Sequence, residues 1–91
     1  MACSVWTYSR VDANVFARLR KRAARQGFTI PEAPSGKFRI TIAGMQIHFH
    51  YEWNAAKQTL KLTCTDKPFV ISCGTIKGYA DKIVNEAIHS R

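Results

Sequence analysis

The sequence predicts a two-layer α+β domain in which a helix is followed by an antiparallel meander of three or four strands and then by a second helix, both helices covering one face of the sheet. Three observations predict this fold. Apolar residues recur at helical spacing near both ends of the chain, whereas the middle of the chain alternates apolar and polar residues. The clearest alternation is the segment 45–53, MQIHFHYEW. The 91 residues fit one domain, so we expect a single core spanning residues 1–91.

The first helix is bounded by residues with capping chemistry. Ser9 can cap its start, Asp12 then falls in the first turn, where the helix dipole favours an acid, and Gly27 is a typical stop. The apolar stripe along this helix consists of Val11, Val15, Phe16, Leu19 and Ala23. The opposite stripe consists of Asn14, Arg18, Lys21 and Arg25. The helix is therefore amphipathic, with an outer side that is almost purely cationic.

The meander follows a loop at residues 28–36, where two prolines and a glycine prevent the helix from continuing. Residues 37–43 alternate apolar and polar side chains. The dipeptide Ala43-Gly44 is short enough to join them to the strand 45–53 in a tight antiparallel hairpin. A polar turn then leads to a third alternating segment at residues 60–65.

The strand 45–53 separates a core face from a displayed face, because successive side chains of a strand point to opposite sides. The core row consists of Met45, Ile47, Phe49, Tyr51 and Trp53. The displayed row consists of Gln46, His48, His50 and Glu52.

A fourth strand and the second helix complete the predicted fold. Residues 69–73, FVISC, can add a short strand at the sheet edge, where Pro68 removes no hydrogen bond from the ladder. The second helix begins with Ser72 or Thr75 as its cap and ends near the C-terminus. Its apolar stripe consists of Ile76, Ala80, Ile83, Val84, Ala87 and Ile88.

The cysteines and the apolar content predict a cytoplasmic location. Cys3, Cys64 and Cys73 are odd in number and lack CxxC spacing, which is typical of reduced thiols. The N-terminal segment MACSVWTYSR has neither a basic start nor an apolar core, so we expect a chain that is not exported. No run approaches the roughly 20 apolar residues that span a bilayer, so we expect no membrane partner.

The residues give little support to catalytic or metal chemistry. Phosphate-loop, nucleophile-elbow and zinc-protease motifs are absent, and the six acids are scattered. His48, His50 and Glu52 share the displayed face. The Cα atoms of His48 and Glu52 lie roughly 13 Å apart, however, which is too far for all three side chains to bind one ion. Cys73 precedes the second helix, where a thiol can become reactive, but we expect it to be a small buried hydrophobe. The sequence therefore predicts no enzyme activity, no metal site and no cofactor.

The net charge of +8 is the strongest functional signal, and residues 1–30 carry six basic groups against Asp12 alone. A field of this sign favours nucleic acid, an acidic protein surface or an anionic lipid. The candidate polyanion-binding residues are Arg18, Arg20, Lys21, Arg22 and Arg25. A secondary basic surface on the displayed sheet face consists of Lys37, Arg39, His48, His50 and Lys61. Because arginine grips phosphate well, the favoured function is a non-catalytic nucleic-acid-binding module that uses the cationic face of the first helix.

The alternative is a protein-interaction or homodimerisation module that acts through a sheet edge or the outer sheet face. Trp6, Tyr8 and Trp53 are large enough to anchor such an interface if they are exposed. The order helix, three strands, helix resembles the topology of double-stranded RNA binding domains. The second helix here has only Lys77 and Lys82, and the hairpin turn has two residues, so we assign no family.

Overall fold

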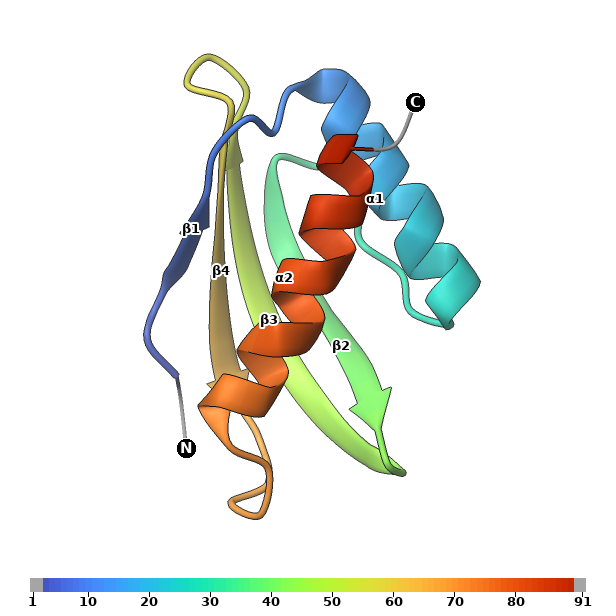
Figure 1. The fold of residues 1–91 in the computed structure, drawn as a ribbon, viewed down its shortest axis with the longest axis vertical. Helices are drawn as coiled ribbons and strands as arrows, with labels where there is room; N and C mark the ends of the chain where they lie inside the picture. The colour runs from blue at the N-terminus through green and yellow to red at the C-terminus, as the bar shows by residue number, and fades with distance from the viewer. Residues whose placement is uncertain (1–2, 90–91) are drawn as a thin grey trace.

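The computed structural model describes residues 3–89, which form a four-stranded antiparallel sheet with both helices on the same face (Figure 1). The elements, in chain order, are β1 (Trp6–Tyr8), α1 (Ala13–Gln26), β2 (Ser35–Ile42), β3 (Met45–Asn54), β4 (Thr59–Asp66) and α2 (Cys73–His89). The strands lie in the order β1-β4-β3-β2, so β1 and β2 are the two edges. The fold class predicted from the sequence is confirmed.

Helix α1 begins three residues later than the sequence suggests. Its N-cap is Asp12 and not Ser9, and the Asp12 carboxylate accepts a hydrogen bond of 2.8 Å from the backbone N–H of Val15. Arg10 has a φ of 63°, in the left-handed region, which a continuous right-handed helix starting at Ser9 could not contain. The predicted stop is confirmed, since Gly27 has a φ of 95° and closes the helix in the left-handed conformation.

The hairpin between β2 and β3 has the predicted two-residue turn. Ala43 and Gly44 both have positive φ, 53° and 79°, which suits the twist of a tight antiparallel hairpin. The predicted alternation of β3 is also confirmed, because its core row is buried at Ile47, Phe49 and Tyr51. The two histidines of β3 therefore lie on the sheet face that no helix covers.

The fourth strand is β1, which pairs with β4, and the predicted strand at residues 69–73 is wrong. The chain turns back in that region, where the buried Lys67 donates from Nζ to the carbonyl of Ile71 at 2.7 Å. Phe69 lies at the tip of the turn with 83% of its surface exposed. Helix α2 then starts with Ser72 as its cap, since the Ser72 hydroxyl accepts the Thr75 N–H at 3.1 Å.

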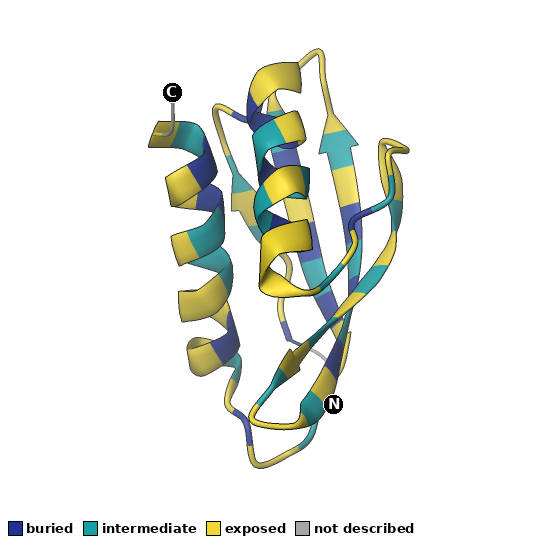
Figure 2. Cartoon of the chain, turned by 90° about the vertical axis from the view of Figure 1, so that its right-hand side faces the viewer, coloured by how far each residue is buried: buried dark blue, intermediate teal, exposed yellow. Residues whose placement is uncertain are grey.

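The core lies between the two helices and the inner face of the sheet, and the buried positions of both layers face each other (Figure 2). Phe16 of α1 stacks on Trp53 of β3 with ring centroids 4.4 Å apart. The indole N–H of Trp53 donates to the carbonyl of Val11 at 2.7 Å, so its polar atom is satisfied inside the structure. The Tyr51 hydroxyl donates a hydrogen bond of 2.9 Å to the carbonyl of Pro31 and thereby holds the loop after α1 against the sheet.

A disulfide bond joins Cys3 to Cys73 across a sequence separation of 70 residues. Cys64 remains as a buried thiol. The predicted set of three reduced thiols is therefore wrong, and Cys73 is a bonded cysteine and not a small buried hydrophobe. The bond links the segment before β1 to the first residue of α2.

Within residues 3–89, neither helix combines the length and the apolar character that a membrane span requires.

Candidate polyanion-binding surfaces

The cationic residues of α1 divide into a group of four and a single outlier. At 100° per residue, Arg18, Lys21, Arg22 and Arg25 fall within about 100° of the helix circumference. Arg20 lies on the other side, where its Nε donates to the carbonyl of Ile30 at 3.1 Å. The structure thus separates Arg20 from the other four predicted polyanion-binding residues and gives it a role in fixing the loop after α1.

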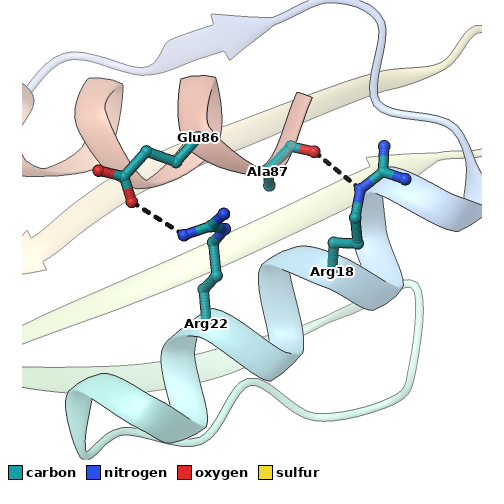
Figure 3. Close-up of polar contacts among 4 residues, drawn as sticks. All are labelled: Arg18, Arg22, Glu86 and Ala87. Atoms are coloured by element: carbon teal, nitrogen blue, oxygen red, sulfur yellow. Dashed lines mark hydrogen bonds and ion pairs between the residues drawn. The ribbon is translucent and has the colours of Figure 1, made fainter. Parts of the chain in front are cut away.

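Arg18 and Arg22 reach from α1 to the C-terminal turns of α2 (Figure 3). Arg18 donates from Nε to the carbonyl of Ala87 at 2.9 Å, and its two Nη atoms point away from that carbonyl. Arg22 forms an ion pair of 3.1 Å with Glu86. A cation is favoured at the C-terminal end of a helix, where the last carbonyls lack partners within the helix. These two arginines therefore stabilise the packing of α1 against α2.

Lys21 and Arg25 are exposed, and neither makes an ion pair with any residue in the part of the chain that the structure describes. They lie beside Arg18 and Arg22 on the same stripe of the helix. The α1 stripe is thus defined by four residues, Arg18, Lys21, Arg22 and Arg25. Of these, Lys21 and Arg25 have charges that no acid of residues 3–89 neutralises in an ion pair.

The predicted secondary surface is brought together by the strand register on the outer face of the sheet. Lys37 of β2 lies opposite His50 of β3, and Arg39 lies opposite His48. Lys61 of β4 lies opposite Glu52 of β3, so one of the three full positive charges has an acid beside it. His48 of β3 lies opposite Asp66 of β4, and Lys37 and Arg39 both belong to the edge strand β2.

The outer face also contains a shallow depression of about 380 Å³. Its lining residues are Val5, Thr7, His50, Glu52, Lys61 and Thr63. No group of three potential metal ligands lies together in residues 3–89. The depression is open and lined by both charges, which suits contact with an extended ligand better than enclosure of a small one.

The aromatic residues that sequence analysis offered as interface anchors are engaged in the fold. Tyr8 donates to the Asp81 carboxylate at 2.7 Å, and burial together with this bond raises the pKa of the Tyr8 hydroxyl. Hydrogen bonds from Lys77 and Tyr8 lower the pKa of Asp81. Trp6 packs half-buried against the core, as does Trp53. None of the three aromatic residues is available as an exposed anchor.

The sequence pattern did not predict which large apolar side chains are exposed. They are Val5, Phe69, Val70 and Tyr79. Phe69 and Val70 belong to the segment predicted as a strand, in which alternate residues would have been covered. The signal that could have found them is Pro68 with the preceding Asp66-Lys67, a typical turn sequence.

No protein-family model, curated protein or solved structure matches this chain.

Proposed function

We propose that this chain is a non-catalytic nucleic-acid-binding module that contacts the phosphate backbone through α1. The observation that carries the proposal is that Arg18, oriented by the Ala87 carbonyl, lies beside the exposed Lys21 and Arg25 on one stripe of α1. Arg18 is oriented by the Ala87 carbonyl through Nε, which leaves its two Nη atoms for a phosphate oxygen. Orientation before binding reduces the side-chain entropy that binding would otherwise remove.

The length of the stripe sets how many phosphates it can contact. Arg18 and Arg25 are seven residues apart, so their Cα atoms are separated by about 10.5 Å along the helix axis. Phosphates of one strand follow each other at about 3.4 Å along a duplex axis, so the stripe spans about three of them. Three contacts correspond to a slope of about −2.7 for the logarithm of the association constant against the logarithm of salt concentration. Affinity is then expected to fall roughly 40-fold between 50 and 200 mM salt.

The test uses a fluorescently labelled duplex and a pair of variants with equal net charge. Lys21→Glu removes a contact within the stripe, whereas Lys57→Glu makes the same change in the exposed turn between β3 and β4. We expect Lys21→Glu to weaken binding and to flatten the salt dependence, while Lys57→Glu leaves the slope unchanged. Equal losses in the two variants would mean that only net charge matters, and the assignment to α1 would then fail.

A second candidate function, protein binding through a sheet edge, is supported by β2. This edge strand has eight residues, whereas the opposite edge, β1, has three. A long open edge is a template for pairing with another chain. The oligomeric mass in dilute solution at high salt tests the homodimer version of this function, because a mass of one chain excludes a stable second copy.

The cytoplasmic location stays a prediction, and its support from the cysteines is lost. Disulfides persist mainly in oxidising compartments, and the predicted reduced state of Cys3 and Cys73 was part of the reasoning. Lysis of cells directly into a denaturing buffer that contains an alkylating agent, followed by a count of modified cysteines, tests it. Three modified cysteines would favour a reducing cytoplasm, and one would favour an oxidising compartment.

A further inference from the structure

The backbone of β2 presents four residues to solvent along the sheet edge. In a hairpin with a two-residue turn, the two residues that flank the turn form two backbone hydrogen bonds with each other. Along the strands, hydrogen-bonded pairs then alternate with pairs that are not hydrogen-bonded to each other. Here the residues that flank the turn are Ile42 and Met45, so every second residue back from Ile42 bonds to β3. The residues between them have N–H and C=O groups that point away from the sheet; they are Ser35, Lys37, Arg39 and Thr41. In the described part of the chain, no backbone hydrogen bond outside the strand ladders reaches any of these four residues.

The two faces of this edge differ in chemistry. Lys37 and Arg39 are exposed on the outer face of the sheet. Phe38 and Ile40 point to the inner face but are only half-buried, whereas Phe49, their neighbour on β3, is buried. In Figure 1 the two helices cover the middle of the sheet, and the β2–β3 hairpin projects beyond them. The edge therefore has a cationic outer side and an incompletely covered apolar inner side.

An apolar crevice continues the inner side of the edge. Its volume is about 30 Å³, and it has no polar lining. Phe38 and Ile40 of β2 face Ala80 and Ile83 of α2 across it, and Phe28 contributes from the loop after α1. The crevice is large enough for part of one aliphatic side chain, and Phe38 and Ile40 of the edge strand belong to its lining.

A second copy of this chain is disfavoured at this edge in a register that pairs the most residues of the two β2 strands. Antiparallel pairing of two β2 strands about Phe38 would put Lys37 of one copy opposite Arg39 of the other, twice. Like charges directly opposite each other destabilise a strand pair. The same two positions instead match acidic residues on a different chain.

We infer that β2 binds an extended segment of a partner protein in which acidic residues alternate with apolar residues. This inference rests on the second candidate function, protein binding through a sheet edge. The added strand pairs with the outward N–H and C=O groups of β2, its acids lie opposite Lys37 and Arg39, and its apolar residues cover Phe38 and Ile40. The net charge of +8 favours the encounter with an acidic partner.

The test uses three synthetic peptides of eight residues in which valine alternates with glutamate, threonine or lysine. Backbone amide exchange is measured by NMR. The glutamate peptide is expected to slow exchange at Lys37, Arg39 and Thr41 by about tenfold or more at saturation. Exchange at Phe38 and Ile40 stays unchanged, since those amides already bond to β3. Two favourable charge pairs make the glutamate peptide roughly 2- to 30-fold tighter than the threonine peptide.

Variants separate this inference from the nucleic-acid proposal. The double variant Lys37→Glu with Arg39→Glu should bind the lysine peptide and lose the glutamate peptide. The double variant Lys21→Ala with Arg25→Ala should keep the glutamate peptide, because its substitutions lie on α1. If that variant loses the peptide, binding is through the α1 stripe and the inference is wrong.

The remaining outcomes are equally distinct. Equal protection by the threonine and glutamate peptides would refute the acidic partner while keeping a sheet-edge function. Absence of protection by all three peptides would refute both. Slow exchange at Lys37 and Arg39 without any peptide, in a sample with the mass of a dimer, would show that the occupant is a second copy.

Discussion

The disulfide between Cys3 and Cys73 predicts a large dependence of stability on redox state. Reducing the bond, or replacing both cysteines by alanine, releases a loop with a sequence separation of 70 residues. In the chain-entropy treatment, a loop of this length changes the free energy of unfolding by about 4 kcal/mol. Small domains have total stabilities of about 5–15 kcal/mol, so the bond contributes a large part of the stability.

The assay is thermal unfolding of the wild-type protein with and without a reducing agent. For a domain of 91 residues, a loss of about 4 kcal/mol corresponds to a decrease in Tm of roughly 15–30 °C. The double variant Cys3→Ala with Cys73→Ala is the matched control, and its Tm should be low and insensitive to the reducing agent. Both predictions depend on the long-range bond and not on Cys64, which is a buried free thiol.

A count of thiols tests the same reasoning independently. Protein prepared in air without a reducing agent and then denatured should have one titratable thiol, and prior reduction should raise this number to three. Three thiols in the unreduced protein, together with a Tm that the reducing agent does not alter, would refute the assignment of the bond.

Three further predictions concern the α1 stripe, the contact between β1 and α2, and the loop before α2. Lys21→Ala with Arg25→Ala should reduce the salt slope of duplex binding from about −2.7 to about −0.9, because one phosphate contact of three remains; an unchanged slope in a fluorescence titration would contradict the proposed stripe. Tyr8→Phe should lower the free energy of unfolding by roughly 1 kcal/mol at neutral pH, through loss of its hydrogen bond to Asp81. Because the folded-state pKa of Asp81 lies below its ordinary 3.8, this contribution is present above pH 4 and is lost as the pH falls through the folded pKa, so urea unfolding of the two proteins should converge in acid. Ile71→Ala should cost about 2–4 kcal/mol because the side chain is buried, while Phe69→Ala should change stability by less than about 0.5 kcal/mol; equal effects in thermal unfolding would mean that the tip at Phe69 is packed.

Local patterns were sufficient to predict the parts of the fold that depend on neighbouring residues. The period of two in residues 45–53 identified the buried Ile47, Phe49 and Tyr51, because each inward position faces the same helices. Gly27 identified the end of α1, because its left-handed φ suits glycine better than any other residue. These features require no knowledge of the distant chain.

The features that sequence analysis missed depend on distant contacts or on very short segments. Strand β1 has three residues, too few for alternation to be recognised, and it forms because β4 offers an edge. The bond between Cys3 and Cys73 cannot be deduced from an odd number of cysteines, because three cysteines allow three pairings. Only the packing of β1 against β4, which places the N-terminal segment near the start of α2, selects this pair.

The cationic stripe shows why a charge run is an incomplete guide to a binding site. Sequence analysis assigned all five basic residues of α1 to a polyanion, but Arg20 holds the carbonyl of Ile30 and Arg22 pairs with Glu86. Arg18 donates to a C-terminal carbonyl of α2, where the helix dipole favours a cation whether or not a ligand is present.

Part of the charge on α1 therefore stabilises the contact between the helices, and ligand affinity should depend mainly on Lys21 and Arg25. Substitutions at Arg18 and Arg22 are expected to change folding stability as well as binding, so only the two exposed residues can test the function without altering the fold.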